Sequence, residues 1–113
     1  MTAGVNDRFD FTAPVPPVAD LGPVHFIAIG GSGMSGVARM FLAAGVPVSG
    51  SDARDSDTLR TLGAEGATVF VGQRPENLAD DVQTVVISSA IRETNPELAA
   101  ARERGLRVLH RAQ

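Results

Sequence analysis

A glycine-rich junction between an apolar run and a helical pattern is the feature that most constrains this fold. Residues 24–29 read VHFIAI, and residues 28–38, AIGGSGMSGVA, bring four glycines and two serines directly behind them. A short branched-apolar run bounded by glycine is typical of a strand buried on both faces of a parallel sheet. Beyond the glycines, apolar residues recur at the spacing of one helix face, at Val37, Met40, Phe41 and Ala44. The junction therefore predicts a strand, a tight turn and a helix that Gly45 ends.

The rest of the chain continues this alternation in short elements. Further strands are predicted at residues 48–50, 68–72, 83–88 and 106–110. Ser56 or Asp55 is expected to cap a second helix that Gly63 stops, and the run from Asn95 and Pro96 to Gly105 carries both end signals of a third. Crossover rules then favour an α/β fold: a Rossmann-like, doubly wound parallel sheet of five strands in the order 3-2-1-4-5, in a single domain.

The glycines also fit a nucleotide-binding fingerprint. Gly31, Gly33 and Gly36 match G-x-G-x-x-G after a strand and at the start of a helix, which is the context the motif requires. Glycine lets backbone N–H groups approach an anion, and the helix N-terminus adds partial positive charge. The alternative is that these glycines only allow close packing of strand and helix, a role we expect for Gly36 in either case. Ser32 and Ser35 add hydroxyl donors, whereas Met34 is expected to fill a gap or form an apolar wall.

Two more stretches are expected beside this turn. Asp52 ends the second strand about 20 residues beyond the first fingerprint glycine, where a carboxylate accepts from ribose hydroxyls or caps the next helix. Residues 88–91, SSAI, follow the fourth strand at the switch point where such sheets bind ligands. His25 is interpreted as a structural histidine, because it opens the first strand at the end away from that point.

Composition excludes several classes of function. All ten basic residues are arginine, so the chain has no lysine for a phosphate-binding P-loop, and it has no cysteine for disulfides or thiolate chemistry. The net charge of −3 is spread without blocks, which argues against nucleic acid as a partner. Two histidines without recognisable ligand spacing give no metal site. The sequence also lacks an apolar run of membrane-spanning length and a basic signal region, so no membrane association and a cytoplasmic location are expected.

Proline content and hydrophobic periodicity divide the chain into two parts. Residues 1–23 are rich in proline and show no sustained period, so they are predicted to form a disordered leader. Residues 24–113 carry all of the predicted strands and helices and are assigned to the sheet domain.

Four motifs in order give this second part a family resemblance. HFIAIGGSGMSGVA, VSGSD, VVISSAI and NPEL resemble the N-terminal domain of Mur ligases, the enzymes that add amino acids in peptidoglycan synthesis, and among them the ligases that join L-alanine to UDP-N-acetylmuramate. The resemblance implies a domain that holds the UDP part of this sugar nucleotide. It also implies that ATP, Mg²⁺ and the amino acid bind in further ligase domains, so that this stretch has no catalytic residue, metal or cofactor of its own.

The resemblance also implies the site residues. Matched by motif, the pyrophosphate would face Gly31, Ser32, Gly33, Met34 and Ser35, Asp52 would lie in the uridine region, and the uracil or ribose would face Ser88, Ser89, Ala90 and Ile91. Two positions depart from the family pattern. Ala28 replaces a common glycine, which we expect to be harmless in a strand, and Gln73 replaces a common histidine, which puts a uridine-side contact there in doubt.

Two alternatives remain open on the residues alone. The glycine fingerprint with Asp52 also suits the NAD site of a dehydrogenase or regulatory module, although the chain has room for little more than one half of such a fold. A structural module without a ligand predicts that Gly33→Val changes nothing except stability.

Overall fold

The computed structural model describes residues 21–110, apart from the side chain of Ser32, and the predicted sheet is present in them. The strands are β1 (Val24–Ile27), β2 (Val48–Asp52), β3 (Thr68–Val71), β4 (Thr84–Ile87) and β5 (Arg107–His110). All pairings are parallel and the order is β3-β2-β1-β4-β5, which confirms the predicted topology. The helices are α1 (Ser32–Ala43), α2 (Asp57–Ala64) and α3 (Pro96–Glu103), with a short 3-10 helix η2 (Pro75–Asn77) between β3 and β4.

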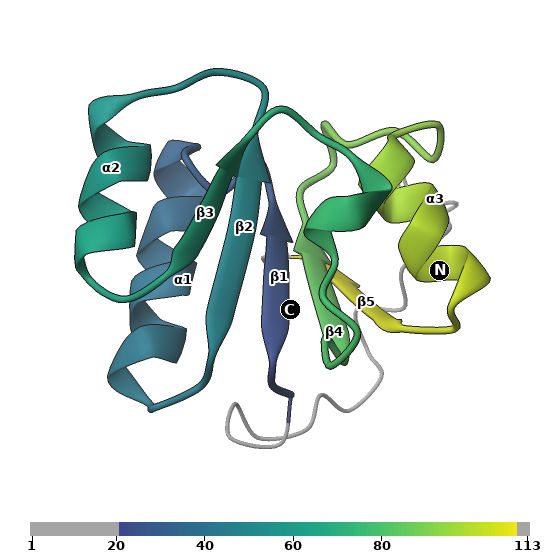
Figure 1. The fold of residues 1–113 in the computed structure, drawn as a ribbon, viewed down its shortest axis with the longest axis horizontal. Helices are drawn as coiled ribbons and strands as arrows, with labels where there is room; N and C mark the ends of the chain where they lie inside the picture. The colour runs from purple at the N-terminus through teal and green to yellow at the C-terminus, as the bar shows by residue number, and fades with distance from the viewer. Residues whose placement is uncertain (1–20, 111–113) are drawn as a thin grey trace, which may run out of the picture.

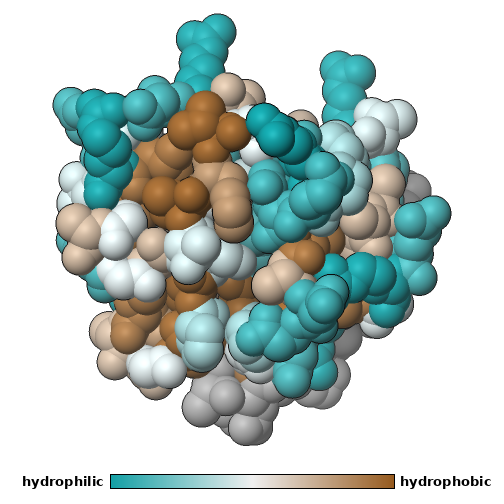
Figure 2. Space-filling model, viewed as in Figure 1, coloured by the Kyte–Doolittle hydropathy of each residue, from teal (hydrophilic) through white to brown (hydrophobic). Residues whose placement is uncertain are grey.

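The helices cover the two faces of the sheet unequally. Figure 1 shows α1 and α2 side by side on one face, and α3 with η2 on the other. Phe26 of β1 meets Phe41 of α1 edge-on with 5.5 Å between ring centroids, in the larger apolar core on the α1 side. On the α3 side, Leu98 packs with Val85 and Ile87 of β4 in a smaller core. Part of the sheet face over β2 and β3 is left without a helix, and Figure 2 shows apolar surface from that side.

The helix ends follow the predicted signals, with one exception. The Ser56 hydroxyl accepts from the Leu59 amide at 3.1 Å, and the Asn95 side chain accepts from the amides of Glu97 and Leu98. Each such cap stabilises its helix by about 1 kcal/mol. Gly63 was predicted to stop α2, and this is wrong, because the helix continues through it to Ala64.

The buried face of α1 differs from the predicted one. Met40 is 63% exposed, whereas Met34, Ala38 and Phe41 are buried. Positions 34, 38 and 41 also have helical spacing, so the face that meets the sheet is turned away from Met40.

Residues before the predicted domain boundary at residue 24 already pack against the sheet domain. Leu21 is buried in the larger core, and the Pro23 carbonyl accepts from the Gln83 amide at 2.9 Å. The remainder of the predicted leader, residues 1–20, lies outside the described residues. Within residues 21–110, none of the helices is long and apolar enough to span a membrane.

Candidate nucleotide site

The carboxyl ends of the strands bring the predicted site segments to one edge of the sheet. β1 and β4 are neighbours, yet their following helices lie on opposite faces, so the switch point falls between them. The turn after β1, residues 28–31, and the loop after β4, residues 88–91, therefore begin beside each other. We call the first segment the glycine turn. The loops after β2 and β3 begin at the same edge, since Asp52 pairs with Val71 in register.

Hydrogen bonds fix the start of the glycine turn. The Gly31 amide donates to the Ala28 carbonyl at 3.1 Å, and the Gly30 amide donates to Oδ2 of Asp52 at 3.0 Å. A Cβ atom on Gly30 would lie 2.7 Å from that carboxylate oxygen, so a side chain there would displace the carboxylate. Asp52 thus anchors the turn from the neighbouring strand. Its predicted contact with uridine stays a prediction.

Ala28 lies just beyond β1 rather than in it. Its φ of +65° is in the left-handed region, where a Cβ atom is strained and glycine is not. The placement of Ala28 in the strand is therefore wrong, and the expectation that alanine is harmless here loses its basis.

The first turn of α1 lies beside the switch point. Gly31 is the N-cap residue, and the first turn carries no acidic side chain. The Ser35 amide makes the first helical bond, to the Gly31 carbonyl at 2.8 Å, so helix geometry leaves the amides of residues 32–34 without helical acceptors. Gly33 is exposed, which leaves its backbone open to an anion.

The other fingerprint positions divide between core and surface. The side chains of Met34 and Ser35 are 3% and 6% exposed, and Met34 belongs to the larger core. Met34 therefore fills space as predicted from the residues. Gly36 was expected to allow close packing, but a Cβ atom there would meet no described atom within 4 Å, so this expectation is wrong.

The loop after β4 presents two small residues to solvent. Ser89 and Ala90 are exposed, Ser88 is half-buried, and Ile91 is buried in the smaller core. The Ser89 hydroxyl lies 2.8 Å from Nε2 of His110 at the end of β5.

A buried carboxylate below this edge is the feature that sequence reasoning missed. Glu97, the second residue of α3, is fully buried. Its Oε1 accepts from Nε2 of His25 at 2.8 Å and from the Ser51 hydroxyl at 2.6 Å. Its Oε2 accepts from the Asn77 amide group at 2.6 Å and from the Arg74 backbone amide at 3.1 Å. The carboxylate therefore joins β1, β2, the β3–β4 connection and α3.

The hydrogen bonds decide the charge of this group. Burial on its own raises the pKa of Glu97, but the donors His25, Ser51 and Asn77, with the charge of a protonated His25, outweigh burial and lower the pKa. Glu97 is therefore ionised at neutral pH, with a donor for each lone-pair direction. The structural interpretation of His25 is confirmed, since the ring is buried and also contacts Ser49 through Nδ1 at 2.8 Å.

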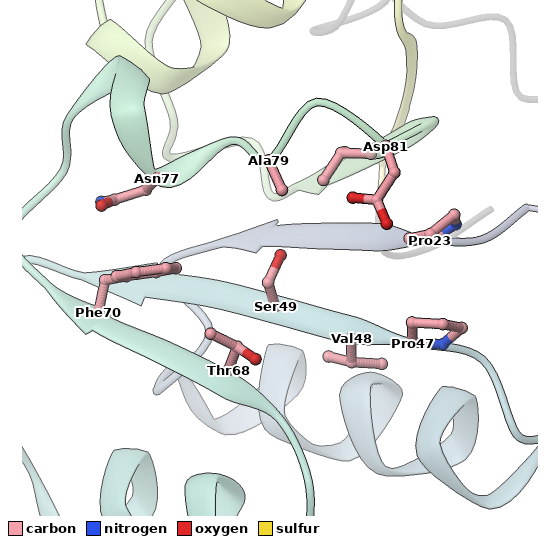
Figure 3. Close-up of a pocket in the computed structure, with 10 residues that line it drawn as sticks. Pro23, Pro47, Val48, Ser49, Thr68, Phe70, Asn77, Ala79 and Asp81 are labelled. Carbon is pink, nitrogen blue, oxygen red and sulfur yellow. The ribbon is translucent and has the colours of Figure 1, made fainter.

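A hollow of about 180 Å³ lies away from the predicted site. It occupies the sheet face over β2 and β3 that no helix covers, and Figure 3 shows Pro23 and Pro47 at one end and Asn77 at the other. Both prolines precede their strands, so the hollow reaches toward the amino ends rather than the switch point. Among residues 21–110, no group of three or more acidic, histidine or cysteine side chains is arranged to hold a metal ion.

Comparisons with known proteins agree with this geometry. Residues 23–113 match the sequence family described as "Mur ligase family, catalytic domain". The UDP-N-acetylmuramate–L-alanine ligase of Thermobifida fusca is 61% identical over 89% of this chain and 21% of its own length, and that of Renibacterium salmoninarum is 60% identical over 83% and 20%. The chain thus spans about a fifth of these relatives.

Solved structures give the same result. The UDP-N-acetylmuramate–alanine ligase of Thermotoga maritima superposes with a TM-score of 0.75 and 32% identity, over 79% of this chain and 20% of that one. The UDP-N-acetylmuramate:L-alanyl-γ-D-glutamyl-meso-diaminopimelate ligase of Neisseria meningitides gives 0.72 and 29%, over 80% and 28%. These matches do not support the dehydrogenase alternative. Because the family model matches residues 23–113 and a relative is 61% identical over 89% of this chain, the chain belongs to the Mur ligase family.

Proposed function

We propose that this chain binds the UDP part of UDP-N-acetylmuramate at the carboxyl edge of its sheet. The observation that carries the proposal is the glycine turn, held by Asp52 and leading into a helix N-terminus without acidic side chains. Such a terminus favours a pyrophosphate. Relatives at about 60% identity are named for this sugar nucleotide.

In this proposal the pyrophosphate contacts the residues predicted from the motif. Gly31 and Gly33 offer backbone, Ser32 and Ser35 belong to the same turn of helix, and Met34 contributes its backbone while its side chain stays in the core. The uridine lies between Asp52 and the loop of Ser88, Ser89, Ala90 and Ile91.

The whole protein is proposed to be an ATP-dependent ligase that joins L-alanine to UDP-N-acetylmuramate in peptidoglycan precursor synthesis. This chain spans about a fifth of its relatives and has no lysine, so ATP, Mg²⁺ and L-alanine are assigned to the remaining ligase domains. Its own contribution is binding energy and orientation of the sugar nucleotide. The cytoplasmic location expected from the sequence is part of this proposal, as is the absence of nucleic-acid and membrane partners.

Calorimetry with the 113-residue chain tests the binding proposal. UDP-N-acetylmuramate and UDP are expected to give saturable heats, and NADH is expected neither to bind nor to compete. No heat from either uridine nucleotide at millimolar concentration contradicts the proposal, and displacement of UDP by NADH favours the dinucleotide alternative.

A matched pair of substitutions in α1 locates the site. Gly33→Val places a branched side chain at the exposed first turn and is expected to weaken UDP binding about tenfold or more, because it separates the phosphate from the backbone donors. Ala43→Val adds the same branching at the exposed far end of the helix and serves as the control. Equal affinities of the two variants would show that the phosphate lies elsewhere.

A further inference from the structure

The two oxygens of Glu97 contact two different parts of the molecule. Among residues 21–110, the donors to Oε1 lie in the sheet: they are His25 of β1 and Ser51 of β2. The donors to Oε2 from the same range lie in the connection after β3: they are the Arg74 amide and the Asn77 side chain. The carboxylate therefore bridges a rigid sheet and a connection that has only one short turn of 3-10 helix of its own.

The connection concerned is residues 72–77, which we call the β3 loop. Asn77 also donates to the Gly72 carbonyl at 2.8 Å, so it closes the loop upon itself. Asn95, the N-cap of α3, donates to the Gln73 side chain at 2.8 Å. The start of α3 thus holds the β3 loop at three points: Gln73, Arg74 and Asn77.

The β3 loop is in turn bonded to the candidate site. The Gly72 amide donates to the Asp52 carbonyl at 2.7 Å, and the Asp52 side chain accepts from Gly30 in the glycine turn. A continuous series of hydrogen bonds therefore runs from buried Glu97, through the β3 loop and Asp52, to the glycine turn.

The stability of the fold does not by itself explain why a charged carboxylate is buried at residue 97. A buried carboxylate loses its hydration, and well-packed apolar side chains of similar volume stabilise a fold as well or better. What an apolar side chain does not provide is four directed acceptor positions that fix four segments in register.

We propose that Glu97 is a positioning residue of the nucleotide site, whose Oε2 holds the β3 loop and, through it, Asp52 in the geometry that binds ligand. Glu97 itself does not touch the ligand. The inference rests on the proposed function, because it assigns the β3 loop to the rim of that site.

Two variants, each lacking one donor to the carboxylate, distinguish a role of Glu97 in positioning the β3 loop from a role in the stability of the fold. Asn77→Ala deletes one loop-side donor to Oε2 and leaves the Arg74 amide in place there, whereas Ser51→Ala deletes one sheet-side donor to Oε1 and leaves His25. Asn77→Ala is expected to weaken UDP-N-acetylmuramate binding to the 113-residue chain about tenfold, and Ser51→Ala less than about twofold. Both measurements are made where circular dichroism shows a folded variant.

Hydrogen exchange of the β3 loop provides a readout that does not need the ligand. Amides of residues 72–77 are expected to exchange faster in Asn77→Ala than in Ser51→Ala, relative to the amides of β1 in the same variant. Equal losses of affinity in both variants, no loss in either, or unchanged loop exchange would overturn the inference. Failure of the unsubstituted chain to bind any uridine nucleotide would instead overturn the proposed function, and the exchange result would still decide whether the β3 loop depends on Asn77, which donates both to Glu97 and to the Gly72 carbonyl.

Discussion

At the scale of single residues, Ala28 is the clearest case of local strain. A non-glycine residue in the left-handed region destabilises the folded state by about 1–2 kcal/mol. Glycine avoids this strain, but it loses more backbone entropy on folding, which offsets about 0.5–1 kcal/mol of the gain. Ala28→Gly is therefore expected to stabilise the fold by about 0.5–1 kcal/mol, measured as the free energy of unfolding in urea. Loss of stability instead would mean that the methyl group, which packs against the smaller core, outweighs the strain.

The buried Glu97 also predicts a pH dependence at this scale. Its folded-state pKa is lowered below the value of about 4.3 in an unfolded chain, so the unfolded chain takes up its proton at the higher pH. The stabilisation by Glu97 is therefore complete above about pH 4.3 and is lost as the pH falls through the folded-state pKa. His25 is the ionisable group that faces it, with Nε2 2.8 Å from Oε1 of Glu97.

Glu97→Gln tests this by removing the titration. At pH 7 the variant is expected to be about 3 kcal/mol less stable, because two or more donors lose their acceptor. The difference in unfolding free energy from the unsubstituted chain should shrink as the pH is lowered below about 4. A difference that stays constant from pH 7 to pH 3 would show that the carboxylate is not selectively ionised in the folded state.

At the scale of elements, two glycines near the end of α2 differ in whether their backbone conformation requires glycine. Gly66 has a φ of +118°, where a side chain is strained, whereas Gly63 lies inside the helix and a Cβ atom there would be 3.3 Å from the Val69 side chain. Gly66→Ala is expected to cost about 1–3 kcal/mol. Gly63→Ala is expected to change stability by less than about 1 kcal/mol, because improved helix propensity offsets the close contact. Thermal unfolding of the two variants decides this, and a larger loss in Gly63→Ala would reverse the assignment.

The elements also show why prediction from sequence succeeded where it did. Strand, turn and helix signals such as Asn95 with Pro96 depend on neighbouring residues alone, so they can be recognised before the fold is known. Crossover rules then favour the strand order. The burial of Glu97 is not local: it depends on His25, Ser51 and Asn77 meeting one helix end in space. Asn95 and Pro96 marked that helix end correctly, yet nothing in their neighbourhood indicated that the next residue points inward.

At the scale of the whole molecule, the sheet has a protected centre and weaker edges. β1 and β4 are buried throughout and pair on both sides, whereas β3 and β5 have one partner each and are partly exposed. Edge strands open without breaking the rest of a sheet, so their amides exchange through smaller openings.

Native-state hydrogen exchange in low denaturant measures this division. Amides of β1 and β4 are expected to show the denaturant slope of global unfolding, because they are exposed only when both apolar cores separate. Amides of β3 and β5 are expected to show lower free energies of exchange and shallower slopes. One common slope for all four strands would mean that the edges unfold only with the centre. The carboxylate of Glu97 would then tie the β3 side of the sheet to the core more tightly than strand pairing does.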